Sequence, residues 1–203
     1  MNPLNSIKGT IALGFIAAIV AIFALDMTSM FPAEAGIGSF SFLITVWLHV
    51  LAGIVWIGLL YYFNFVQVPA MGAAAADSDG PGPAAIGKYV APRALLWFRM
   101  AAATTWLIGM SLLAQANSAG FQGIMDAFLF TEGSQVIGLG AWLGTIMAFN
   151  VWVLIWPNQK KILGMVEASA EEIAKAKFTA AMASRTNVVL SVPMLLTMFA
   201  AHI

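Results

Sequence analysis

Two histidines are the side chains of this sequence best suited to bind a metal or to carry a proton, and His49 is the first of them. In its apolar stretch, one face at helical spacing is formed by Thr45, His49, Gly53, Trp56 and Leu60. Gly53 is one turn from His49 and removes side-chain bulk where a flat ligand would lie beside the imidazole. This pattern predicts a cofactor ligand or a proton carrier. The alternative is a neutral histidine that hydrogen-bonds a neighbouring helix.

The second histidine, His202, comes at the end of the last apolar stretch, where an interfacial position is its simplest interpretation. Together, His49 and His202 would supply the two imidazoles that the iron of a haem b accepts as axial ligands. Depth limits this pairing: His49 lies about nine residues, or roughly 14 Å, along its helix, and His202 is expected nearer the surface. The two share one iron only if helix tilt or different helix ends bring them to one level.

Arg99 and Asn150 are two further polar side chains within apolar stretches. Arg99 lies about six residues into its stretch, so we expect its long side chain to reach the nearer headgroups. The alternative role for Arg99 is a clamp for a carboxylate, such as a cofactor propionate or an anionic substrate. Asn150 needs a hydrogen-bond partner, which we expect on a neighbouring helix.

The composition indicates that lipid, not water, surrounds the elements that position these residues. Hydrophobic residues make up 61% of the chain, charged residues 9%, and the mean hydropathy is +0.90. A soluble domain has about 25% charged residues and could not bury so much apolar surface in one core. The net charge of zero gives no indication of a nucleic-acid partner. Because the chain has no cysteine, disulfides, thiolate metal sites, iron–sulfur clusters and a c-type haem are excluded.

Five stretches approach the roughly 20 apolar residues that cross a bilayer, and they are continuous rather than alternating. We expect transmembrane helices at about residues 10–30, 40–66, 94–116, 135–156 and 187–203. The first is expected to be a retained helix, because Ala33-Glu34-Ala35 lies too far beyond it for a signal-peptide cleavage site. The predicted fold is therefore a single all-α integral membrane domain.

The basic residues predict the orientation of this bundle. If the N-terminus is cytoplasmic, all nine lysines and arginines fall at or near the inner side, as the positive-inside rule requires. The C-terminus is then outside. On the inner side we expect a flexible connection over 68–92 and an amphipathic helix at about 170–185, which Ser169 and Glu172 begin with a capping box.

Three stretches of the chain resemble the membrane domain of bacterial urate hydroxylase, the urate oxidase N-terminal family. The first is His49-Val-Leu-Ala-Gly-Ile-Val-Trp56-Ile-Gly58, and the second runs from Asn150 to Lys161 through Pro157-Asn158-Gln159. The third is Ser184-Arg185-Thr186-Asn187, with Pro193-Met-Leu and His202 after it. The resemblance covers most of the chain from residue 40 onward, and its second and third pieces are the more specific.

The resemblance implies oxidation of urate, with electrons passed to a c-type cytochrome. Family members typically carry more transmembrane helices and a fused cytochrome c domain, whereas this sequence has no Cys-x-x-Cys-His and has Thr186 where the family shows a histidine. The expected function is thus a haem-b redox module of the bacterial inner membrane, with His49, His202, Arg99, Gly53 and Trp56 around the cofactor. A structural subunit of a larger complex or of a homo-oligomer is the second interpretation, and a small transporter or channel the third.

Overall fold

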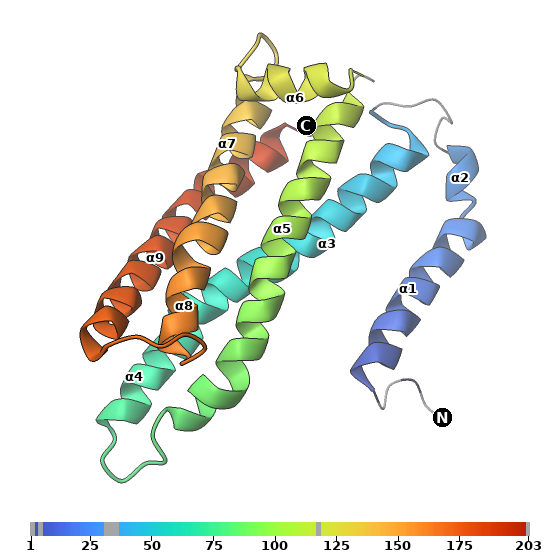
Figure 1. The fold of residues 1–203 in the computed structure, drawn as a ribbon. Coiled ribbons are helices and arrows are strands. Elements are labelled where there is room, and N and C mark those ends of the chain that lie inside the picture. The colour runs from blue at the N-terminus through green and yellow to red at the C-terminus, as the bar shows by residue number, and fades with distance from the viewer. Residues whose placement is uncertain (1–2, 4–5, 31–36, 117–118, 202–203) are drawn as a thin grey trace.

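A helix occupies most of each expected span in a computed structural model of the chain, which describes residues 3, 6–30, 37–116 and 119–201 (Figure 1). The elements are α1 (Ile7–Ala24), α2 (Met27–Met30), α3 (Phe40–Tyr62), η2 (Phe63–Gln67), α4 (Val68–Ala76), η3 (Ile86–Val90), α5 (Ala91–Gln115), α6 (Phe121–Phe128), α7 (Gln135–Phe149), η5 (Asn150–Ile155), α8 (Trp156–Ile162) and α9 (Ala170–Ala200). None of these described residues forms a strand. The predicted all-α class is confirmed.

Four continuous helices among the described residues are long and apolar enough to cross a membrane. They are Phe40–Ala76, Ile86–Gln115, Gln135–Ile162 and Ala170–Ala200, and α1 adds a shorter apolar helix. Serines set two of their starts, because Ser39 Oγ accepts from the backbone N–H of Phe42 at 3.1 Å and Ser169 forms the predicted capping box with Glu172. The chain is a multi-pass membrane protein.

Three of these helices contain a wider π-helical turn, and each turn is followed by proline within two residues. The pairs are η2 with Pro69, η3 with Pro92 and η5 with Pro157. Proline has no N–H, and its ring collides with the carbonyl four residues earlier. A π turn moves that carbonyl away, so the helix continues through the proline instead of ending there.

The spanning helices alternate in direction and pack in two main pairs, α3 with α5 and α7 with α9 (Figure 1). The short helix α6 lies across one end of the bundle, between α5 and α7. Two glycines permit this close packing of α6 against α5 and α7. A Cβ on Gly123 would collide with the carbonyl oxygen of Leu113, and one on Gly138 with that of Ala127. Helix α1 is beside α3 and touches it through Phe15 and Trp47, whose ring centroids are 5.7 Å apart.

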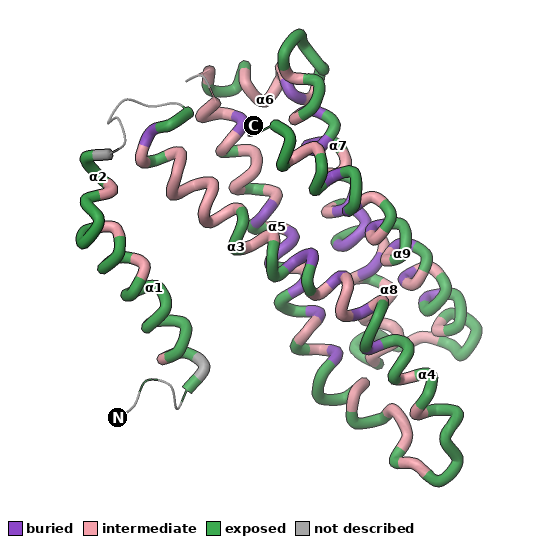
Figure 2. The backbone as a smooth tube through the Cα atoms, turned by 180° about the vertical axis from the view of Figure 1, so that it is seen from behind, coloured by how far each residue is buried: buried purple, intermediate pink, exposed green. Residues whose placement is uncertain are grey.

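The buried residues form a band along the middle of the α3, α5, α7 and α9 bundle (Figure 2). Leu60, Phe98, Met147 and Ala102 are among its most buried members. On α9, small residues recur on the buried face at Ala176, Ala180 and Ala183, which lets the backbones of neighbouring helices approach closely. Most of the remaining apolar surface faces outward, as expected of helices in lipid.

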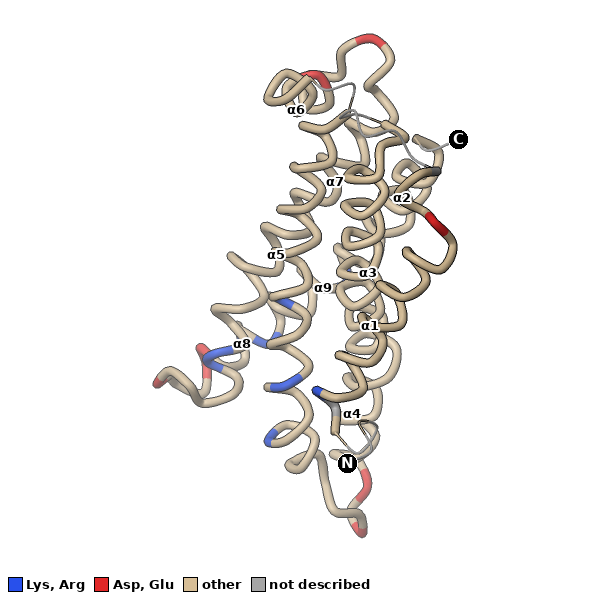
Figure 3. Tube along the Cα trace, turned by 90° about the vertical axis from the view of Figure 1, so that its right-hand side faces the viewer, with Lys and Arg blue, Asp and Glu red and all other residues tan. Residues whose placement is uncertain are grey.

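The lysines and arginines lie toward the end of the bundle where α4 and α8 are found (Figure 3). The N-terminal part of α1 begins at this end and α9 finishes at the other. The predicted one-sided charge distribution is therefore present in three dimensions. That the basic end faces the cytoplasm remains a prediction from the positive-inside rule.

Two boundaries differ from the sequence prediction. The first span, expected at 10–30, is interrupted by a turn at residues 25–26 between α1 and α2. The connection expected over 68–92 is helical at both ends, in α4 and η3, so it is confined to 77–85. Alanine is the strongest helix former, and Ala73–Ala76 therefore extend the second span rather than form a loop. As the sequence allowed, the predicted inner helix at 170–185 runs on into the fifth span as one helix, α9, because no breaking residue separates them.

Candidate functional site

His49 lies on the side of α3 that packs against α5, and its side chain is half-buried. A Cβ built on Gly109 of α5 would lie 3.1 Å from Cε1 of His49 and 3.6 Å from its Nδ1. The imidazole therefore rests against a residue without a side chain, and any larger residue there would crowd the ring. Sequence reasoning missed Gly109 because the glycine is on the partner helix, and no spacing within α3 indicates it.

Gly53 and Trp56 continue the same face of α3 away from His49. A Cβ on Gly53 would lie 3.8 Å from Cγ2 of Thr105, an ordinary contact, so Gly53 faces α5 one turn further along the helix pair. Trp56 is 2% exposed, and its Nε1 has no hydrogen-bond acceptor in the part of the chain that the structure describes. Buried N–H groups without a partner are rare, so the indole offers a donor to a bound molecule.

Arg99 lies against an aromatic ring of another helix. Its guanidinium carbon, Cζ, is 3.7 Å from the ring centroid of Trp156 at the start of α8, and both side chains are half-buried. This is cation–π geometry, in which the ring offsets part of the cost of taking the charge out of water. A stacked guanidinium keeps its N–H donors in the plane of the group, where they can still bind a carboxylate.

Arg99 and His49 are separate in the bundle. Gly109, which marks the level of the imidazole on α5, is about ten residues or roughly 15 Å along that helix from Arg99. The two side chains therefore do not meet, although a ligand that extends along the α3–α5 contact would approach both levels. His202 lies outside the described residues, so its distance from His49 is not defined. Within the described ranges, no three or more His, Cys, Asp or Glu residues form a metal-binding group.

Asn150 and Asn187 form a buried pair that links η5 to α9. Asn150 Nδ2 donates to Asn187 Oδ1 at 2.8 Å, and Asn187 Nδ2 donates to the backbone carbonyl of Met147 at 3.0 Å. Met147 is in the last turn before the π turn of η5, where carbonyls are less regularly paired. The prediction that Asn150 bonds a neighbouring helix is confirmed, and its partner belongs to the third sequence motif.

Two further hydrogen bonds connect α3 and η2 to the same face of α9. The hydroxyls of Tyr61 and Ser191 are 2.9 Å apart, and Asn64 Nδ2 donates to Ser184 Oγ at 2.8 Å. Sequence reasoning missed Tyr61, Asn64 and Ser191. The polar spacing Ser184, Asn187, Ser191 along one helical face was the available signal. These bonds fix the helix that carries His49 to the one that carries the family motif.

Comparison with protein families gives a match for the C-terminal part of the chain. The sequence model described as urate oxidase N-terminal matches residues 116–203, which include α6 to α9 and the second and third motifs. The His49 motif on α3 precedes the matched residues. No curated protein and no solved structure matches the chain. Over residues 116–203, therefore, this membrane protein is similar to the urate oxidase N-terminal family.

Proposed function

We propose that this protein is a membrane-embedded redox module of the bacterial inner membrane, which binds haem b through His49 and passes electrons to a separate c-type cytochrome. The proposal rests on one observation, an imidazole half-buried between two spanning helices and held against Gly109. A titratable ring at such a depth is costly, which makes a functional role the default interpretation. Imidazole is also the usual protein ligand of b-type haem iron.

The surrounding residues fit such a group in two respects. Gly109 leaves room for the imidazole between α3 and α5, and the buried Nε1 of Trp56 lacks the acceptor that a carboxylate or carbonyl would supply. A bound haem would supply one-electron chemistry. The chain itself would hold the iron through His49, donate a hydrogen bond from Trp56, and exclude water with the apolar core around Trp56 and Leu60.

Arg99 and His202 have subsidiary parts in the proposal. Arg99, stacked on Trp156, would balance the charge of a propionate or of an anionic substrate. His202 would supply a second imidazole to hold the iron. Gly53 would keep α3 and α5 close at the level of Thr105 and so maintain the contact that carries the site.

A visible spectrum tests this function directly. The full chain, purified from cells supplied with haem precursor, should show a Soret band and a reduced-minus-oxidised difference spectrum. His49→Ala should remove the band, whereas Val50→Ala, an exposed neighbour on the same helix, should leave it unchanged. His202→Ala should change the spin state of the haem and retain the pigment, since one ligand remains.

A colourless wild-type protein, or pigment unchanged in His49→Ala, would refute haem binding by this site.

Helix α1 favours a second candidate, the structural subunit, because almost all its side chains from Ile11 to Ala24 are exposed and form an apolar surface. A colourless protein that purifies in a stoichiometric complex with a larger membrane assembly would support that function instead.

A further inference from the structure

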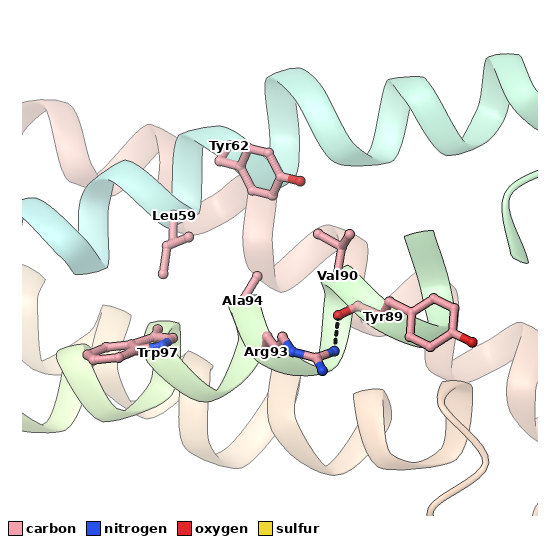
Figure 4. A pocket seen from close by; sticks show the side chains of 7 residues that line it. All are labelled: Leu59, Tyr62, Tyr89, Val90, Arg93, Ala94 and Trp97. Carbon is pink, nitrogen blue, oxygen red and sulfur yellow. Dashed lines mark hydrogen bonds between the residues drawn. The ribbon is translucent and has the colours of Figure 1, made fainter. Parts of the chain in front are cut away.

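A groove of about 380 Å³ opens on the surface of the bundle between α3 and the start of α5 (Figure 4). Leu59 and Tyr62 line it from α3, while Val90, Ala94 and Trp97 line it from η3 and α5. Val90 and Trp97 are exposed, so the groove faces the surroundings of the bundle rather than its core. It is an open groove rather than an enclosed pocket, so a ligand in it would keep one side toward the surrounding lipid. The groove thus offers an apolar ligand a site within the membrane.

One end of this groove is positively charged. Arg93 lines it and is exposed, and its Nη1 donates to the carbonyl of Tyr89 at 2.5 Å, which holds the guanidinium in place (Figure 4). Lys88 is adjacent, with Nζ 5.4 Å from the ring centroid of Tyr89. Within the described residues, the one ion pair joins Lys161 to Glu172, so neither Arg93 nor Lys88 is neutralised by a carboxylate there. The basic end of the groove is therefore complementary to an anion.

We propose that this groove binds an anionic phospholipid, with its phosphate at Arg93 and Lys88 and an acyl chain along Leu59, Ala94 and Trp97. The lining is almost entirely apolar and matches an acyl chain, while the basic end matches an anionic headgroup. A water-soluble anion would use only the basic end. Arginine binds phosphate oxygens with two N–H donors in one plane. Aromatic residues such as Tyr89 and Trp97 are also typical of the depth at which headgroups meet hydrocarbon.

Native mass spectrometry of the full chain in mild detergent tests the proposal, with phosphatidylglycerol and phosphatidylcholine of identical acyl chains as probes. Phosphatidylglycerol should remain bound and phosphatidylcholine should be lost. Arg93→Gln should weaken retention at least about fivefold, which corresponds to about 1 kcal/mol for one basic residue near a membrane surface. Arg93→Lys should retain part of the binding. Arg185→Gln, which removes an exposed arginine of α9, should leave it unchanged.

A groove-filling variant separates a built site from general charge attraction. Ala94→Phe leaves every charge in place but occupies the groove, and it should lose phosphatidylglycerol to the same extent as Arg93→Gln. If its circular dichroism shows unfolding, Ala94→Met provides the smaller test. Equal losses in Arg93→Gln and Arg185→Gln, equal retention of both lipids, or full retention in the folded groove-filling variant would each overturn the proposal. Competition by inorganic phosphate as strong as that by phosphatidylglycerol would identify a free-anion site instead.

Discussion

The surroundings of His49 are determined as much by α5 as by its own helix. A Cβ on Gly109 would come within 3.1 Å of the imidazole, closer than an ordinary van der Waals contact, whereas one on Gly53 meets Thr105 at 3.8 Å. The imidazole thus occupies space that a side chain at position 109 would need.

Gly109→Val should destabilise the protein by about 1–3 kcal/mol, because the added carbons must displace the imidazole of His49 from a packed contact. Thermal unfolding in detergent measures the loss. The matched control is Gly58→Val on α3, an exposed position where a Cβ would meet nothing within 4 Å. Both variants replace glycine by valine in a helix, so the difference between them reports the contact with His49.

A double variant isolates that contact further. In the His49→Ala background, Gly109→Val should cost less than in the wild type, since the ring that it would displace is gone. Equal losses for Gly109→Val and Gly58→Val, or no coupling between positions 49 and 109, would show that the imidazole does not depend on this glycine.

At the scale of the helices, hydropathy was sufficient to place four spans, because twenty-residue apolar stretches have few alternative structures; at the first expected span, 10–30, the structure has only the shorter helix α1 and a turn before α2. Hydropathy could not place the π turns, which depend on how a helix accommodates Pro69, Pro92 and Pro157. Nor could it pair the helices. The sequence indicated that Asn150 needs a hydrogen-bond partner. It did not indicate Asn187, because this pairing depends on how α7 and η5 pack against α9, which no spacing along the chain encodes.

Asn187→Leu should lower stability by about 1–2 kcal/mol, because it leaves the buried amide of Asn150 without an acceptor. Replacing both residues, as Asn150→Leu with Asn187→Leu, should cost less than the two single changes added together, since no amide is then unpaired. Unfolding in a mixed detergent series measures all three. Gln122→Leu, which removes the exposed bond to Asp126, should change stability by only about 0.5 kcal/mol or less. Additive losses at positions 150 and 187 would contradict the pairing.

For the whole molecule, the charge distribution distinguishes the two ends of the helix bundle. The lysines and arginines gather near α4 and α8, while the connection that includes α6 carries Asp126 and Glu132 without a basic residue (Figure 3). Arg93 and Lys88 at the basic end belong to the proposed lipid groove, and the proposed haem ligand His49 is on the other side of Gly53 along α3. Lipid binding and electron transfer would thus use different levels of one helix pair, α3 and α5.

The absence of cysteine in the chain makes its orientation directly measurable, because any single introduced cysteine is unique. Ser78→Cys lies in the connection 77–85 at the basic end, and Glu132→Cys lies in the exposed turn before α7. A membrane-impermeant maleimide applied to cells with a permeabilised outer membrane should label Glu132→Cys and should label Ser78→Cys only after the inner membrane is broken. Positive residues are retained on the cytoplasmic side during insertion, which is the physical reason for this order. The reverse pattern would place the basic end outside, and then the proposed lipid would have to come from the outer leaflet.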